Sequence, residues 1–179
     1  MKLRQFQCGR SDRESTLRDA ARLEPPLRAA LEAVFSTKML NKIDVQPRLR
    51  DKVCDEVGTS LVPGAYSVYT HGNGHKPSRV FKITICKGMS YGQKLMAIAM
   101  AVAEIRLLAT NQLHFREYSD GLTWLTWVPT GQKRVAGSLS KPWDTEVLRI
   151  ADTLWPAIEG SVDCTDFGSG FLPVWRSSE

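Results

Sequence analysis

The segment between residues 90 and 110 constrains the fold more than any other part of the chain. Its apolar side chains do not keep to one stripe of a helix, because Leu95 and Ile98 mark one side while Met96 and Met100 mark another. A helix that is apolar on nearly every side has to be buried on nearly every side. We therefore expect a central helix around which the remaining elements pack.

Glu104 places a carboxylate in the middle of this apolar helix. Burying a carboxylate costs free energy unless hydrogen-bond donors or a cation accompany it. Pairing with an arginine or with backbone amides would make Glu104 structural, whereas a different environment would let it act as an acid or base. Arg106 is too close in sequence to share the same helix face. We favour the structural interpretation, which requires a partner from elsewhere in the chain.

Helices are predicted for most of the N-terminal part of the chain, and prolines set their limits. A first helix is interrupted at Pro25 and Pro26, because proline lacks the amide hydrogen and clashes with the preceding turn. The same two prolines suit the first turn of a second helix. Pro47 is interpreted as the start of a third helix, which ends at Gly58.

Two β-hairpins are predicted, one before and one after the central helix. In the first, residues 66–70 precede residues 79–87, where apolar and polar side chains alternate as in a half-buried strand. In the second, residues 113–118 and 122–128 lie on either side of an Asp-Gly turn, which is a strong hairpin signal.

A short strand, a last helix and an apolar tail follow the second hairpin. The strand is expected near Val135 and the helix over residues 143–159. Pro156 should kink this helix or end it early, since proline cannot continue the hydrogen-bond ladder. Residues 171–175 of the tail are apolar, so they have to pack on the domain or on a partner.

These elements predict a single α+β domain over residues 1–179, with a helical part (1–60), a sheet-and-helix core (61–160) and a tail (161–179). A chain of 179 residues can bury one sizeable core without disulfide or metal crosslinks. The predicted architecture is N-terminal helices followed by hairpin–helix–hairpin–helix. An antiparallel sheet of four to five strands would pack on the buried central helix.

The order of these elements over residues 63–160 resembles that of the secretion-chaperone-like α+β proteins. Those proteins are binding folds, so the resemblance implies that this chain binds a partner rather than catalysing a reaction. The resemblance concerns element order and not sequence motifs. Those chaperones are typically acidic, whereas this chain carries a formal net charge of +5.

The cysteines and the N-terminus bear on the compartment. Cys8, Cys54, Cys86 and Cys164 are irregularly spaced, and none belongs to a C-x-x-C pair. The N-terminus lacks the apolar stretch of a secretory signal. We therefore expect reduced thiols in the cytoplasm. A membrane-spanning helix needs about 20 apolar residues, and the longest apolar run, residues 95–103, is shorter, so no membrane association is expected.

Residue patterns typical of enzymes are absent from the sequence. His71, His75 and His114 could offer a metal three nitrogen ligands, but their spacing is not diagnostic, and we interpret the first two as exposed turn residues. The central helix lacks the H-E-x-x-H pair of zinc peptidases, and neither a G-x-S-x-G elbow nor a phosphate-binding loop occurs. We predict no metal, no cofactor and no enzymatic activity.

Basic residues concentrate in the middle of the chain. Residues 61–140 carry nine basic and three acidic side chains, whereas residues 141–179 carry three and seven. Cations on a hairpin can neutralise phosphates and its tyrosines can stack on bases, although a solvated strand face would have the same composition. The candidate nucleic-acid-binding residues are Lys76, Arg79, Lys82, Lys87, Lys133 and Arg134.

Tryptophans mark a second candidate surface. Trp124 and Trp127 are three positions apart on one predicted strand, so they point to opposite faces and one of them should enter the core. The other could form an exposed anchor with Trp143 or Trp175, since tryptophan is enriched at the centres of protein interfaces. The candidate partner-binding residues are Trp124, Trp127, Trp143, Phe171 and Trp175.

Two binding hypotheses follow. The one that we favour is a non-catalytic protein that binds or assembles with another protein, of the kind that phages and mobile elements use as inhibitors or particle components in the host cytoplasm or the virion. The alternative is a nucleic-acid-binding module that uses the basic hairpin. An enzyme that depends on a metal or on Glu104 is the least favoured reading of the sequence.

Overall fold

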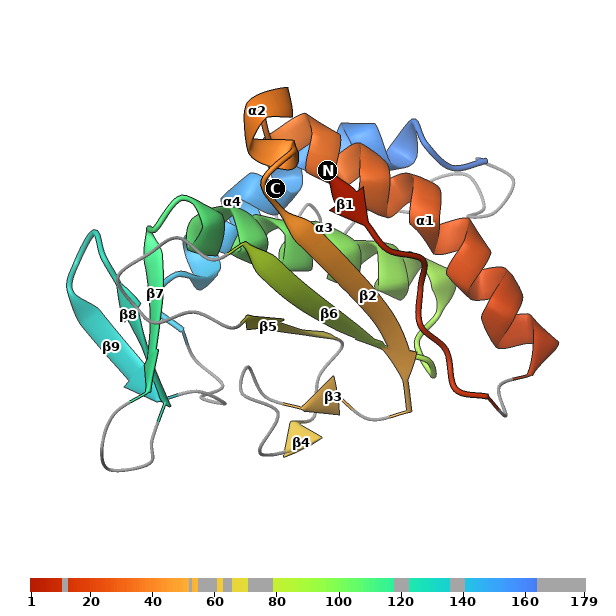
Figure 1. The fold of residues 1–179 in the computed structure, drawn as a ribbon, viewed down its shortest axis with the longest axis horizontal. Helices are drawn as coiled ribbons and strands as arrows, with labels where there is room; N and C mark the ends of the chain where they lie inside the picture. The colour runs from red at the N-terminus through yellow and green to blue at the C-terminus, as the bar shows by residue number, and fades with distance from the viewer. Residues whose placement is uncertain are drawn as a thin grey trace, which may run out of the picture.

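The chain combines helices with runs of consecutive strands, which agrees with the α+β class predicted from the sequence (Figure 1). The long helices α1 (Glu14–Val34), α3 (Tyr91–Ala109) and α4 (Asp144–Glu159) pack on one another, and the short helix α2 (Thr37–Leu40) leads from α1 into the main sheet. The computed structural model describes residues 1–10, 13–51, 53–54, 61–62, 66–70, 79–117, 123–135 and 141–163.

The main sheet is mixed, not antiparallel as predicted. It consists of β1 (Lys2–Leu3), β2 (Asp44–Arg50), β6 (Val80–Cys86) and β5 (Tyr66–Thr70), in that spatial order within the described residues. Strands β1, β2 and β6 run parallel, and β5 pairs with β6 as the antiparallel hairpin that the sequence predicted. The long segment between β2 and β6 permits their parallel pairing, because parallel strands need a crossover connection of about a dozen residues or more.

Strand β2 lies where the sequence predicted the start of a third helix, so the prediction of that helix is wrong. Val45, Pro47 and Leu49 are buried on the face of β2 that packs on the core. An amide hydrogen at position 47 would point away from β6. The Leu49 amide points to the same side, where it donates to the Gln7 carbonyl at the sheet edge. Proline is tolerated in a strand where its nitrogen faces such an edge.

Helix α1 runs without interruption through Pro25 and Pro26, contrary to prediction. Its buried face continues across the two prolines, with Leu23 before them and Leu27 and Leu31 after them fully buried. Packing of this continuous apolar face on the rest of the core outweighs the local cost of proline in the helix interior.

Tyr91 satisfies a carbonyl that Pro26 leaves without its helical donor. In an α-helix the amide of residue 26 would bond to the carbonyl of residue 22. Proline has no amide hydrogen, and the Tyr91 hydroxyl donates to the Arg22 carbonyl at 3.1 Å instead. The Arg22 guanidinium also lies over the Tyr91 ring, 4.3 Å from its centroid.

Replacing Tyr91 with phenylalanine tests this compensation. Tyr91→Phe keeps the ring beneath Arg22 and removes only the hydroxyl that bonds the freed carbonyl. We expect the free energy of unfolding to fall by about 1 kcal/mol, the usual contribution of one hydrogen bond, as measured by urea denaturation. An unchanged midpoint would mean that water serves this carbonyl equally well.

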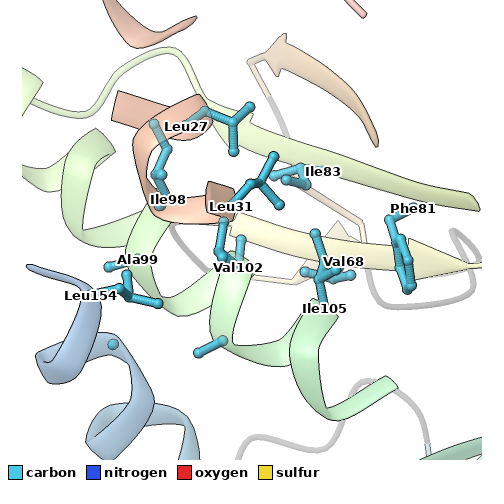
Figure 2. Close-up of a cluster of buried hydrophobic side chains, with 14 of the residues drawn as sticks. Leu27, Leu31, Val68, Phe81, Ile83, Ile98, Ala99, Val102, Ile105 and Leu154 are labelled. Carbon is cyan, nitrogen blue, oxygen red and sulfur yellow. The ribbon is translucent and has the colours of Figure 1, made fainter. Parts of the chain in front are cut away.

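Helix α3 is the central helix that the sequence predicted, and it is buried on nearly every side. It lies against β5 and β6, while α1 and α4 pack on it from elsewhere. Helix α4 continues to Glu159 and does not end early at Pro156, which is exposed. Figure 2 shows the apolar side chains that meet between these elements, among them Leu27, Leu31, Val68, Phe81, Ile83, Ile98, Val102, Ile105 and Leu154.

The other strands form two further small sheets rather than extending the main one. Strands β7 (Leu113–Glu117), β8 (Thr123–Trp127) and β9 (Gln132–Val135) form an antiparallel sheet, which confirms the second hairpin and the short strand near Val135. Strands β3 (Val53–Cys54) and β4 (Leu61–Val62) pair with each other. Sequence periodicity identified most of these strands but could not show which of them share a sheet.

Candidate nucleic-acid interface

The two faces of the main sheet differ in chemistry because apolar and polar residues alternate in β2 and β6. The apolar positions of both strands are buried against the helices, and the polar positions point to the opposite side. We call this opposite side the outer face. In β2 and β6 it consists of Asp44, Gln46, Arg48, Arg50, Val80, Lys82, Thr84 and Cys86.

Strand register brings three cations together on the outer face. Arg48 and Arg50 are alternate residues of β2, and Lys82 of β6 lies opposite Gln46, the next residue along the same face. Adjacent strands are about 4.8 Å apart and alternate residues of one strand about 6.6 Å apart. The three cationic side chains therefore start within a small patch, and all three are half-buried.

Asp44 is the only carboxylate of the outer face as defined, and other groups already bind it. The Arg4 guanidinium lies 2.9 Å from one carboxylate oxygen of Asp44, and the Gln46 amide donates to the same oxygen at 3.2 Å. The hydrogen bond from Arg4 holds the pKa of the Asp44 carboxyl below its ordinary value. Asp44 is thus ionised at neutral pH but balanced by Arg4, which leaves the outer face basic.

The structure separates the cations that the sequence grouped as candidates for nucleic-acid binding. Lys82 lies on the outer face. Arg79 precedes β6 and donates to the Met39 sulfur at 3.4 Å, and Lys87 follows β6 and lies 3.6 Å from the Asp51 carboxylate.

The remaining candidates lie elsewhere. Lys133 and Arg134 are exposed on β9, in a different sheet, and Lys76 lies outside the described residues. The sequence interpretation missed Arg48 and Arg50, because it assigned their segment to a helix. The alternation of polar and apolar residues from Asp44 to Arg50 was the signal that could have found them.

The two proposed anchor tryptophans whose side chains the structure describes lie inside the protein. Trp143 is 0% exposed and Trp127 is 9% exposed, so neither can be a surface anchor in this conformation. That Trp127 enters the core agrees with the prediction that one of the two tryptophans of β8 would do so. The side chain of Trp124 and the whole of Phe171 and Trp175 lie outside the described residues.

Glu104 is paired, which supports the structural interpretation of this buried carboxylate. Its Oε1 accepts a hydrogen bond from the Lys141 ammonium at 3.1 Å and another from the Trp143 indole at 3.3 Å. Lys141 also lies 5.9 Å from the centre of the Trp143 ring. The cation is therefore a lysine that follows the second sheet, not the arginine considered from the sequence. Trp143 is buried in the core with its indole N–H bonded to this carboxylate.

The other candidate sites lie only partly within the described residues. His114 lies on β7, and His71 and His75 are outside the described residues. Among the residues that the structure describes, no three metal-ligating side chains come together. Cys86 is a thiol, and Cys54 has no described side chain. No helix in the described part of the chain is long and apolar enough to cross a membrane.

No family model, no curated protein and no solved structure matches the chain.

Proposed function

We propose that this protein is a non-catalytic nucleic-acid-binding protein that uses the outer face of the main sheet. The observation that carries the proposal is the cluster of Arg48, Arg50 and Lys82 on that face, beside a carboxylate that Arg4 already balances. Clustered cations of this kind bind the phosphate backbone by charge and release its counterions. The site uses Lys82 from the predicted hairpin, together with two arginines from a strand that lies far from it in sequence.

The distribution of charge between the two sides of the molecule supports this proposal. Helix α4 belongs to the helical layer and not to the outer face (Figure 1). Acidic residues outnumber basic ones on α4, whereas the outer face carries clustered cations. Such an uneven distribution of surface charge orients a polyanion as it approaches the protein. The charged residues of α4 are Asp144, Glu146, Arg149, Asp152 and Glu159.

Binding to a protein partner, the hypothesis favoured from the sequence, has less support. Two of its five proposed contact residues, Trp127 and Trp143, are buried. The other three contribute no described side chain. A partner surface built on Trp124, Phe171 and Trp175 is therefore the second candidate, tested by asking whether Trp175→Ala weakens capture of a partner while the fold survives.

A charge-matched pair of variants tests the nucleic-acid proposal. The first combines Arg48→Gln and Arg50→Gln on the outer face, and the control combines Arg18→Gln and Arg28→Gln on the exposed side of α1. Both remove two positive charges. Binding of labelled single- and double-stranded oligonucleotides is followed by fluorescence anisotropy across a salt series.

We expect the outer-face variant to lose affinity by about tenfold or more, since each charge-assisted contact contributes appreciably to binding. Its logarithmic salt dependence should become shallower by about 1.4 on single strands, which corresponds to about 0.7 for each lost phosphate contact. The α1 control should stay near wild type. An equal loss in both variants, or no binding by the wild type at low salt, would overturn the proposal.

A further inference from the structure

The two tyrosines of β5 belong to opposite faces of the main sheet. Tyr66 is the register partner of the fully buried Ile85, and it packs on the hydrophobic core. Tyr69 is the register partner of Lys82, which lies on the outer face. Residues of a strand point alternately to its two faces, so positions 66 and 69 cannot share a face. The side chain of Tyr69 lies outside the described residues, and strand pairing alone assigns this position to the outer face.

Strand register also places Tyr69 at one end of the basic cluster. Tyr69, Lys82 and Gln46 form one row across β5, β6 and β2. Arg48 and Arg50 continue the cluster from Gln46 along β2. With about 4.8 Å between neighbouring strands and about 6.6 Å between alternate residues, the Cα atoms of Arg50 and Lys82 are about 14 Å apart. The outer face thus carries an oblique path of cations that ends next to an aromatic residue.

Such a path suits a single strand of nucleic acid better than a duplex. Each unpaired base has a π-face that stacks on an aromatic ring while the phosphates follow the cations. The bases of a duplex stack on one another, and its major groove admits an α-helix or a two-stranded ribbon. Here the cations lie on the two central strands of a sheet that has four strands within the described residues, which is too broad for that groove.

Charge alone would favour the opposite order of affinities. A duplex carries about one negative charge per 1.7 Å of its axis, whereas each strand carries about one per 3.4 Å. A surface that attracts phosphates only by charge therefore binds the duplex at least as tightly as the single strand. A preference for the single strand requires a contribution from the bases.

We infer that the ligand of the outer face is single-stranded nucleic acid, with a base stacked on Tyr69 and phosphates at Lys82, Arg48 and Arg50. This inference rests on the proposed function and names the ligand class of the same site. The strand crosses β6 and β2 obliquely, along the path of the cations. Because every base has a π-face and every nucleotide a phosphate, the site accepts many sequences.

Replacing the ring at position 69 tests the inference without changing the charge of the protein. Anisotropy is measured with a labelled single strand and with a duplex of the same sequence and length, near physiological salt. Wild type should bind the single strand at least about tenfold more tightly than the duplex. Tyr69→Leu should lose about tenfold on the single strand, because it removes the stacking surface. Its salt dependence should match that of wild type, since no phosphate contact is lost.

Tyr69→Phe is the matched control, because it keeps the ring and removes only the hydroxyl. It should bind the single strand within about twofold of wild type. An equal loss in Tyr69→Phe and Tyr69→Leu, or no loss in Tyr69→Leu, would overturn stacking at this position. Urea denaturation of both variants verifies that the fold is kept.

The preference of the wild-type protein decides the ligand class independently of these variants. A duplex bound as tightly as the single strand, or more tightly, would overturn the inference and leave the proposed function intact. Failure to bind either ligand at low salt would refute the proposed function itself. A preference for the single strand that persists after Arg48→Gln and Arg50→Gln, at undiminished affinity, would place the site elsewhere and overturn both.

Discussion

Glu104→Ala is expected to lower the free energy of unfolding by about 3 kcal/mol or more, as estimated for breaking a buried ion pair. Glu104 is 4% exposed and accepts hydrogen bonds from both Lys141 and Trp143. The substitution removes the shared acceptor of a buried indole and a largely covered ammonium. It also leaves a cavity at helix α3, which is buried on nearly every side, and this adds to the cost.

Two further variants identify the cause of that loss. Glu104→Gln keeps the volume and an acceptor oxygen, so urea denaturation should show a smaller loss than for alanine. Glu32→Ala, at an exposed position of α1, should change stability by less than about 0.5 kcal/mol. If Glu104→Ala were as mild as this surface control, the pairing with Lys141 and Trp143 would not stabilise the fold.

Asp19→Ala should be the second most destabilising of these changes. Asp19 of α1 binds Lys94 of α3, whose side chain is only 5% exposed, so the change leaves an ammonium buried without its carboxylate. We expect a loss of about 2–3 kcal/mol, less than for a fully buried pair because Asp19 itself is 31% exposed. The double variant Asp19→Leu with Lys94→Met should recover most of the loss, because two apolar side chains need no charge partner.

A double-mutant cycle, measured by urea denaturation, gives the contribution of the Asp19–Lys94 pair to the free energy of unfolding. The exposed pair between Glu14 and Arg18 on the same helix is the matched comparison. Its removal by Glu14→Ala should cost less than about 1 kcal/mol, as is usual for surface ion pairs. A double variant as unstable as Asp19→Ala alone would show that helix packing, and not the buried charge, accounts for the loss.

Elements with a strong local pattern could be predicted from the order of amino acids alone. Helix α3 is apolar on nearly every side, so burial was its only stable environment in water. Strand β6 alternates strictly, which placed Phe81, Ile83 and Ile85 inside and Lys82 outside. The free-energy cost of burying the Glu104 carboxylate implied that it has a partner, but it did not identify that partner. Each of these conclusions depends on neighbours within a few residues, which the sequence lists directly.

Features that depend on contacts between distant segments became apparent only in the folded protein. Residues 44–50 form β2 because pairing with β6 places Val45, Pro47 and Leu49 on the sheet face that packs on the core. Helix α1 crosses Pro25 and Pro26 because its apolar face is buried both before and after the two prolines. Long-range burial outweighs the local preference of prolines. The same strand pairing placed Arg48 and Arg50 beside Lys82. The candidate site could not be assembled from the sequence, because its residues meet only once the sheet has formed.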